Sequence, residues 1–170
     1  IDEVQARLPW VCRHEIGKPA GYCHRAVVLG AGPVGLLGAM ALGATGFEVT
    51  VYSREPAPNP KSLLVEAIGA RYVSSQDATP EQLAGLVGNI DVVYEASGAS
   101  SASFDLLRVL GTNGVFVFTG VPGRKAPISL DADLLMKRMV LNNQVLFGTV
   151  NADRGAFESA IRHLEEFDAR

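Results

Sequence analysis

The sequence predicts an α/β fold, a doubly wound parallel sheet of six strands in the order 3-2-1-4-5-6, and three observations predict it. Short apolar runs alternate with helical segments along almost all of the 170 residues. The first apolar run leads directly into a G-x-G-x-x-G motif, which an apolar helix follows. Six strand segments in this alternation match two βαβαβ halves joined by right-handed crossovers.

Composition limits the class of protein. Apolar residues make up 48% of the chain and charged residues 19%, which is ordinary for a globular domain with a buried sheet. The net charge of −3 favours neither nucleic acid nor an anionic membrane as a partner. No apolar run approaches the roughly 20 residues that span a bilayer, and the N-terminus has no signal-peptide core. We therefore expect a cytoplasmic protein.

Residues 1–24 are expected to form an N-terminal helix and a connecting segment, and residues 25–170 one nucleotide-binding domain. Cys12 and Cys23 lie in the connecting segment, beside His14 and His24. Thiolate and imidazole suit zinc, but their spacing here matches no common zinc motif. Ordinary thiols are therefore preferred over a metal site or a disulfide.

Strands are expected where a short run is apolar throughout or alternates and is β-branched. In chain order, this criterion selects residues 26–29, 47–52, 71–73, 90–96, 115–119 and 144–150. Helices are expected where apolar residues recur at helical spacing between the strands. This criterion selects residues 33–42, 62–68, 80–87, 103–110, 131–139 and 153–167.

Capping and breaking residues set several of these boundaries. Pro58 and Pro60 are expected to prevent a helix before residue 62. Thr79 opens a capping box, and Asp131 and Asp153 are suited to cap the last two helices. The final helix carries one apolar stripe, formed by Phe157, Ile161, Leu164 and Phe167.

Each glycine of the motif has its own physical role. Gly30 allows a tight turn, Gly32 lets a pyrophosphate approach the backbone, and Gly35 lets the helix pack closely on the strand. Pro33 suits a first helical turn, where its missing N–H has no helical partner to lose. Because free N–H groups and the positive dipole end face an anion there, a dinucleotide site is favoured over a turn without a ligand.

In a doubly wound sheet, ligands lie outside the carboxyl ends of the strands, where the strand order reverses. The strand ends to consider therefore include Tyr52 and the residues that follow each strand. The candidate cofactor-binding residues are Gly30, Gly32, Pro33, Val34, Gly35, Ser53, Arg54, Ala96, Ser97, Gly98, Thr119, Gly120, Val121, Val150 and Asn151.

The end of the second strand indicates which dinucleotide is bound. NAD sites place an acid there, whereas this chain has Ser53 and Arg54, a hydroxyl and a guanidinium that suit phosphate oxygens. Glu48 lies at the wrong end of the strand, but Glu55 lies just beyond the tip and stays an alternative ribose ligand. We expect NADP to be preferred, with NAD as the alternative.

No catalytic set is evident in this sequence. Asp91 and Glu95 share a strand face, but their spacing along the strand keeps them from acting on one atom. Glu95 could instead line the cleft, and His163 is expected at the surface of the last helix. The chain is therefore expected to hold a cofactor and to lack both catalytic and metal-binding residues.

The sequence resembles the cofactor-binding domain of zinc-type medium-chain dehydrogenases/reductases, and within them the glucose dehydrogenase branch. The resemblance covers nearly the whole chain. In order, it is carried by ARLPW, AVVLGAGPVGLL, SREP, DVVYEASGA, FVFTGVPG and VLNNQVLFGTVNADRGAFESAIRHL. The last segment is the most discriminating, because many dehydrogenases share the glycine motif.

This resemblance implies an activity that needs a second domain. Such enzymes oxidise the C1 hydroxyl of an aldose to a lactone and pass the hydride to NADP or NAD, while zinc polarises the substrate oxygen. Their zinc ligands belong to a GroES-like catalytic domain with no counterpart here. The isolated chain is therefore expected to bind NADP(H) and to be inactive.

The resemblance also implies roles for single residues. Ser53 and Arg54 would bind the adenosine 2′-phosphate. Asn151 would reach the sugar substrate as well as the cofactor. The residues bordering the nicotinamide would be Thr119, Gly120, Val121, Val150 and Asn151. Members of the family often dimerise through the edge strand, here from Gln144 to Val150, so a homo-oligomer is expected.

Other classes of function fit the sequence less well. A free-standing nucleotide-sensing module usually keeps an acid at the second strand tip, which this chain lacks. A methyltransferase would show a different glycine loop and a seventh-strand hairpin. Another zinc-type alcohol or polyol dehydrogenase remains an alternative, because much of the substrate pocket belongs to the second domain.

Overall fold

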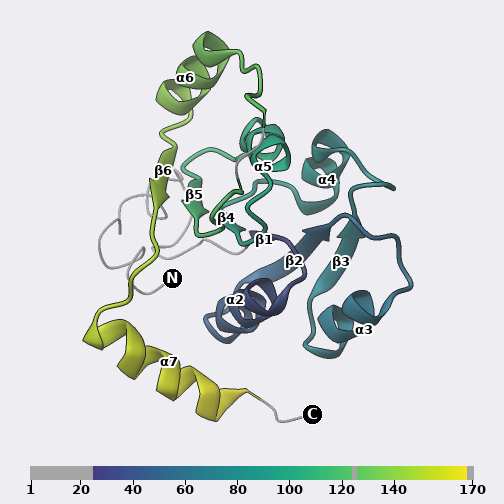
Figure 1. Cartoon of the computed structure of the whole chain (residues 1–170), viewed down its shortest axis with the longest axis vertical. Helices are drawn as coiled ribbons and strands as arrows, with labels where there is room; N and C mark the ends of the chain where they lie inside the picture. The colour runs from purple at the N-terminus through teal and green to yellow at the C-terminus, as the bar shows by residue number, and fades with distance from the viewer. Residues whose placement is uncertain (1–24, 124–125, 168–170) are drawn as a thin grey trace.

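Six parallel strands form the centre of the molecule, in the order β3-β2-β1-β4-β5-β6 (Figure 1). The structure is a computed structural model, and it describes residues 25–123 and 126–167. The strands are β1 (Arg25–Leu29), β2 (Glu48–Ser53), β3 (Arg71–Ser74), β4 (Val92–Glu95), β5 (Val115–Phe118) and β6 (Val145–Gly148). The predicted fold class and strand order are confirmed. The expected N-terminal helix, Cys12 and Cys23 lie outside the described residues.

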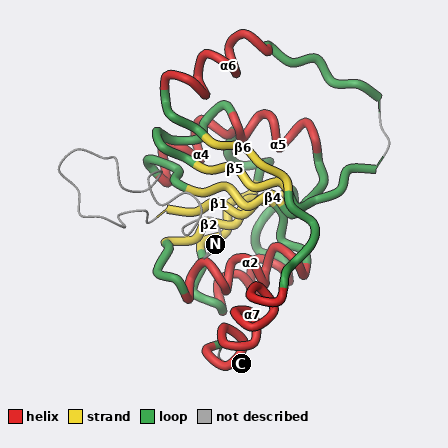
Figure 2. Tube along the Cα trace, turned by 90° about the vertical axis from the view of Figure 1, so that its left-hand side faces the viewer, coloured by secondary structure: helices red, strands yellow, loops and turns green. Residues whose placement is uncertain are grey.

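Helices cover both faces of this sheet. They are α2 (Pro33–Ala44), α3 (Pro60–Ala67), α4 (Pro80–Val87), α5 (Ser100–Leu107), α6 (Ala132–Leu141) and α7 (Arg154–Glu166). Figure 2 shows α2 and α7 on one side of the sheet and α4, α5 and α6 on the other. None of these helices is long and apolar enough to cross a membrane.

Two buried clusters explain the unbroken apolar run of β1. Ala26 and Val28 belong to the cluster under α2 and α3, whereas Val27 and Leu29 belong to the cluster under α4 and α5. Successive side chains of a strand point to opposite faces, so a central strand covered on both sides must be apolar at every position. This is why the run itself predicts a parallel sheet.

Side-chain caps bear out several of the predicted helix starts. Thr79 accepts a hydrogen bond from the Gln82 N–H at 3.3 Å, and the Gln82 side chain accepts one from the Thr79 N–H at 2.8 Å. Asp131 caps α6 through the Leu134 N–H, and Asp153 caps α7 through the Ala156 N–H. These caps satisfy N–H groups that a helix leaves without partners.

The predicted start of α3 is wrong. The helix begins at Pro60 rather than residue 62, because Asn59 accepts hydrogen bonds from the N–H groups of Lys61 and Ser62 at 2.8 and 3.0 Å. Proline in the first turn loses no helical hydrogen bond, so Pro60 begins this helix instead of delaying it.

Several further elements differ in length from the prediction, among them β4, which spans Val92–Glu95 and not residues 90–96. α5 begins at Ser100 and not at residue 103, because its first turn is polar and gives no apolar signal. β6 is shorter than the segment from Gln144 to Val150, since the Gln144 N–H donates to the Met139 carbonyl at 3.0 Å and not to β5. Thr149 adds one more hydrogen bond to β5 before the chain leaves the sheet.

The apolar stripe of α7 is not packed against the described part of the chain. Phe157, Ile161 and Leu164 are each more than half exposed. Figure 2 shows the reason, because α7 lies beside α2 and farther from the sheet. The periodicity predicts the helix correctly, but it does not say what covers its apolar side.

Candidate cofactor-binding site

The glycine loop joins β1 to α2. Gly30 adopts a φ of +108°, which side chains other than glycine rarely accept, and its N–H donates to the Tyr52 carbonyl at 2.9 Å. A Cβ at Gly35 would collide with the Gly30 carbonyl oxygen. The predicted turn role of Gly30 and the packing role of Gly35 are therefore confirmed.

Gly32 is different from the other two glycines. A Cβ built at this position would meet no atom of the described chain within 4 Å. Its backbone φ is −82°, so neither packing nor backbone conformation requires glycine there. What glycine provides at this position is open space directly in front of the loop.

Gly32 also lies directly before α2. Gly32 is the N-cap, with no side chain to satisfy the first N–H groups, and Pro33 follows in the first turn. The first turn contains no acidic residue that would repel an anion. The N–H groups of Val34 and Gly35 therefore lie in the first turn of a twelve-residue helix, at its positive end, where the helix itself supplies them no partner.

The other strand ends lie in one row with this loop. The register of β1 pairs Leu29 with Tyr52 on one side and with Glu95 on the other. The first residue after each of four strands donates its N–H to a neighbouring strand. These bonds are Gly30 to Tyr52 at 2.9 Å, Ala96 to Leu29 at 3.0 Å, Thr119 to Glu95 at 3.0 Å and Thr149 to Phe118 at 3.0 Å.

The two residues expected to select the dinucleotide lie at the carboxyl end of β2. Ser53 is half-buried and Arg54 is exposed. The Glu55 carboxylate, the alternative ribose ligand, lies 2.7 Å from the Lys61 ammonium. The acid beyond the strand tip is therefore already paired with a cation.

The Tyr52 side chain does not face the carboxyl ends of the strands. The residue is 3% exposed, and its hydroxyl donates to the Ala78 carbonyl at 2.7 Å. Burial raises the pKa of the Tyr52 hydroxyl, and the negative charges of Glu81 and Asp105 raise it further. Tyr52 is thus part of the core and not of the site.

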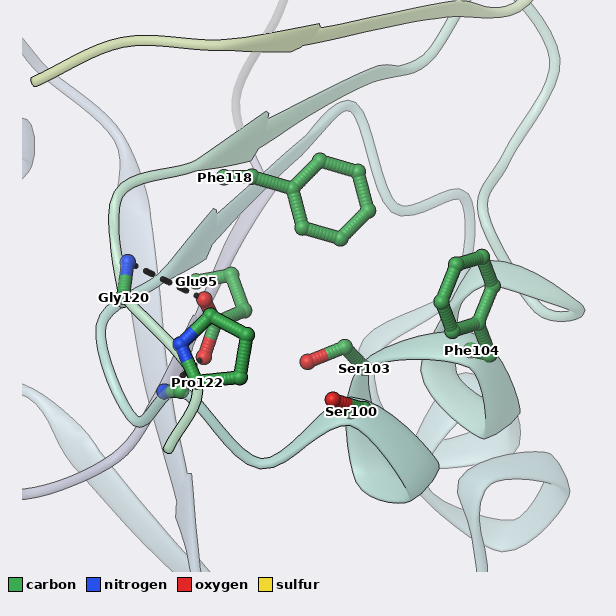
Figure 3. Close-up of a pocket in the computed structure, with 8 residues that line it drawn as sticks. Glu95, Ser100, Ser103, Phe104, Phe118, Gly120 and Pro122 are labelled. Atoms are coloured by element: carbon green, nitrogen blue, oxygen red, sulfur yellow. Dashed lines mark hydrogen bonds between the residues drawn. The ribbon is translucent and has the colours of Figure 1, made fainter. Parts of the chain in front are cut away.

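Glu95 ends β4 and is 1% exposed. Its Oε1 accepts hydrogen bonds from the Ser97 N–H, the Ser97 hydroxyl and the Gly98 N–H, each at 2.7 Å. Its Oε2 accepts one from the Gly120 N–H at 3.1 Å (Figure 3). The sequence indicated that Glu95 could line the cleft, but it gave no sign of this network.

A cavity of about 290 Å³ lies beside Glu95. Its lining combines two aromatic rings, two serine hydroxyls and the backbone of the two strand-end loops (Figure 3). The lining residues are Glu95, Gly98, Ser100, Ser103, Phe104, Phe118, Gly120 and Pro122. Sequence reasoning missed Phe104, Phe118 and the two serines, because their patterns are those of a helix and a strand.

Exposed apolar side chains also lie in the segments that follow the carboxyl ends of β1, β5 and β6. Val34, Val121 and Val150 are 54%, 80% and 79% exposed, and Asn151 is also exposed. Val150 and Asn151 follow Thr149, the last residue hydrogen-bonded to β5. The apolar candidates are thus available for contact with a further molecule or domain.

Acidic residues are not gathered into a metal-binding cluster in residues 25–123 and 126–167. No group of three or more His, Cys, Asp or Glu side chains there could hold a metal ion. Asp91 lies at the start of β4, where it accepts a hydrogen bond from the Arg25 N–H at 3.0 Å. It is thus at the opposite end of the strand from Glu95.

The strand order, the glycine loop after β1 and the helix N-terminus beside it define a Rossmann-type α/β domain. Comparison with protein families gives a more specific assignment. The model described as "Glucose dehydrogenase C-terminus" matches residues 18–170. The chain belongs to this family.

Curated relatives agree with the family assignment. Glucose 1-dehydrogenase of Methanocella arvoryzae is 34% identical over 168 residues, covering 99% of this chain and 44% of the relative. The enzyme of the same name from Thermoproteus tenax is 40% identical over 141 residues, covering 83% of this chain and 39% of the relative. The chain therefore spans less than half the length of these relatives.

Solved structures show the same similarity. Glucose dehydrogenase of Haloferax mediterranei, in complex with NADP, zinc and gluconolactone, matches with a TM-score of 0.83 and 27% identity. The match covers 99% of this chain and 46% of that one. An alcohol dehydrogenase of Thermotoga maritima is 22% identical with a TM-score of 0.74, which shows the shared fold alone. A sensory module or another alcohol dehydrogenase is not favoured by these matches.

Proposed function

We propose that this chain is the cofactor-binding domain of a glucose 1-dehydrogenase and that it holds NADP. The family assignment, the glucose 1-dehydrogenase relatives and the NADP complex of a similar structure support this proposal. Residues 25–170 would form the nucleotide-binding unit. When bound, the nicotinamide would take up the hydride from C1 of the sugar.

The observation that carries the proposal is the open space at Gly32. A protein that needed only a turn between β1 and α2 could accept alanine at this position, because a Cβ there touches nothing. Glycine instead leaves room for a group that approaches the backbone N–H atoms of the α2 N-terminus. A pyrophosphate has the charge and the acceptor oxygens to occupy that space.

Ser53 and Arg54 would bind the 2′-phosphate of NADP. Support comes from their position after β2, which lies beside β1 and its glycine loop, because the adenosine half of a dinucleotide lies on that side in folds of this kind. The Arg54 guanidinium can form two parallel hydrogen bonds with phosphate oxygens. Because Glu55 is paired with Lys61, its charge opposes the phosphate less than a free carboxylate would.

The nicotinamide half would extend in the other direction, over β4, β5 and β6. The residues proposed to border it are Ala96, Ser97, Gly98, Thr119, Gly120, Val121, Val150 and Asn151. Asn151 would also hydrogen-bond to the sugar. Zinc and the rest of the sugar site would be supplied outside the described residues, which contain no metal-binding cluster of their own.

Two wider features belong to the same proposal. Among the described residues β6 is the last strand in the sheet order, so its outer edge would offer backbone groups for pairing with a second copy. We propose a homo-oligomer formed along this edge, which sedimentation would show as a mass of two or more chains. A cytoplasmic location fits a sugar dehydrogenase that uses a soluble cofactor.

Titration of the chain with NADPH tests the function, and Gly32→Ala is the deciding variant. The added methyl group meets no protein atom, although alanine is a poorer N-cap than glycine, so we expect a small decrease in melting temperature and at least tenfold weaker NADPH binding. Gly43→Ala is the matched control, because Gly43 also lies in α2 and a Cβ there also meets nothing within 4 Å. Equal NADPH affinity in the wild type and Gly32→Ala would exclude this loop as the pyrophosphate site.

A further inference from the structure

The buried Glu95 carboxylate connects two loops that come from different strands. Three of its four hydrogen bonds come from Ser97 and Gly98, which follow β4, and the fourth comes from Gly120, which follows β5. We call residues 96–98 and 119–122 the loop pair. One side chain therefore contacts both halves of the loop pair at once.

Four hydrogen-bond donors surround this buried acid. A buried carboxylate is normally stabilised by a cation or by several hydrogen-bond donors. None of the ion pairs found among the described residues includes Glu95. Three backbone N–H groups and one hydroxyl take the place of the cation, and all four act as donors to the carboxylate. A neutral amide at this position could accept only some of these hydrogen bonds.

Close packing at the two glycines shows that this geometry is tightly specified. Gly98 has a φ of +64°, and a Cβ there would lie 2.9 Å from the Val121 carbonyl oxygen. A Cβ at Gly120 would lie 2.6 Å from Glu95 Oε2. The Thr119 hydroxyl also donates to the Glu95 carbonyl at 2.7 Å. The two loops therefore approach each other closely through backbone atoms, and the Glu95 carboxylate bonds to both of them.

The position of the loop pair in the sheet indicates which part of a cofactor it would contact. Ser53 and Arg54 lie on the β2 side of β1, and the glycine loop lies at the end of β1 itself. A dinucleotide with its 2′-phosphate at Arg54 and its pyrophosphate at Gly32 must continue across the ends of β4 and β5. The loop pair lies there, so it would contact the nicotinamide half.

We propose that Glu95 is a positioning residue, which locks the loop pair into one rigid surface against which the nicotinamide half of the cofactor lies. This inference rests on the proposed function. Glu95 touches no ligand itself and acts through the backbone of Gly98 and Gly120. Its loss would loosen the nicotinamide side most. The loop pair also packs against the glycine loop where Ser97 lies beside Gly30, so a smaller effect is expected there, and the 2′-phosphate site would stay in place.

Two ligands separate this role from a general effect on folding. NADPH contains the nicotinamide half, whereas 2′-phospho-ADP-ribose keeps the phosphates and the adenosine but lacks the nicotinamide ring. In Glu95→Gln we expect at least fivefold weaker NADPH binding and a smaller rise and blue shift of NADPH fluorescence on binding. The affinity for 2′-phospho-ADP-ribose should stay within twofold of the wild-type value.

Glu48→Gln is the matched control, because Glu48 is exposed at the opposite end of the sheet, at the start of β2. It should change neither affinity. If Glu95→Gln weakens the binding of both ligands equally, or changes neither affinity, the positioning role is overturned. If the wild-type chain binds neither ligand, the proposed function fails instead.

A second variant keeps the inference testable if Glu95→Gln does not fold. Ser97→Ala removes a single hydroxyl donor to Glu95 and leaves the backbone donors in place. We expect about a twofold to threefold loss of NADPH affinity, again without loss for 2′-phospho-ADP-ribose. An equal loss for both ligands, or none for NADPH, would count against the proposal.

Discussion

The Glu55 carboxylate lies 2.7 Å from the Lys61 ammonium, across the loop that connects β2 to α3. Both side chains are 44% exposed, so the pair is accessible to solvent and modest in strength. The pair matters because of its position, directly after Arg54. It determines whether a negative charge beside the proposed 2′-phosphate site is compensated.

Lys61→Met should therefore lower the preference for NADPH over NADH. Without its partner, Glu55 can repel the 2′-phosphate and compete for Arg54, and we expect a change of about twofold to fivefold, in keeping with the small energies of exposed ion pairs. Glu55→Gln should shift the preference in the opposite direction. Titrations at low ionic strength measure both effects before salt screens them. The double variant Lys61→Met/Glu55→Gln should keep the wild-type preference for NADPH over NADH, and a departure from it would argue against this account.

Arg54→Ala tests the guanidinium itself. Charge-assisted hydrogen bonds contribute about 1.5–3 kcal/mol, so NADPH binding should weaken by at least tenfold. NADH lacks the 2′-phosphate, and its affinity should stay within twofold. Arg71→Ala is the control, since Arg71 is an exposed arginine at the start of β3, the end of that strand away from the proposed phosphate site. Parallel calorimetric titrations with the two cofactors decide the question, and equal losses would remove Arg54 from the phosphate site.

The fold could be predicted because its signals are local. Strands covered on both faces, such as residues 26–29, are apolar throughout, and caps such as Thr79 and Asp153 mark helix starts. The predicted start of α3 is wrong for a local reason too. Asn59 caps the helix and makes Pro60 its first residue, whereas the presence of both Pro58 and Pro60 predicts a later start.

The role of Glu95 could not be predicted in the same way. Three of its four hydrogen-bond donors are backbone N–H groups, which every residue except proline carries. Their convergence depends on the pairing of β4 with β5, which the register of the sheet fixes. The exposed stripe of α7 is a related case, because helical spacing identifies an apolar side without identifying its partner.

Tyr52 should make the stability of the domain sensitive to alkaline pH. Its folded-state pKa is raised above the ordinary 10.0 by burial and by the nearby charges of Glu81 and Asp105. The unfolded chain thus releases the proton at lower pH, so this contribution to stability is complete below about pH 10 and is lost as pH rises through the folded-state pKa. Urea unfolding at pH 8 and above pH 10 measures the loss.

Tyr52→Phe is the matching variant. It removes the hydroxyl that donates to the Ala78 carbonyl, which should lower the free energy of unfolding at pH 8 by about 1 kcal/mol. The further decrease at alkaline pH should be smaller than in the wild type. Tyr72→Phe controls for the loss of a comparable hydrogen bond, from its hydroxyl to the Glu55 carbonyl at 2.7 Å. An alkaline decrease of equal size in Tyr52→Phe and the wild type would contradict the prediction.

Gly35→Ala should destabilise the domain, although alanine favours a helix more than glycine does. The added Cβ would collide with the Gly30 carbonyl oxygen, so α2 must move away from β1. Overpacking of this kind costs about 1–3 kcal/mol, which exceeds the gain of about 1 kcal/mol in helix propensity. Gly43→Ala in the same helix has free space and should be neutral or slightly stabilising. Urea unfolding of both variants gives the comparison, and similar stabilities would mean that the close approach of α2 to β1 does not need glycine at position 35.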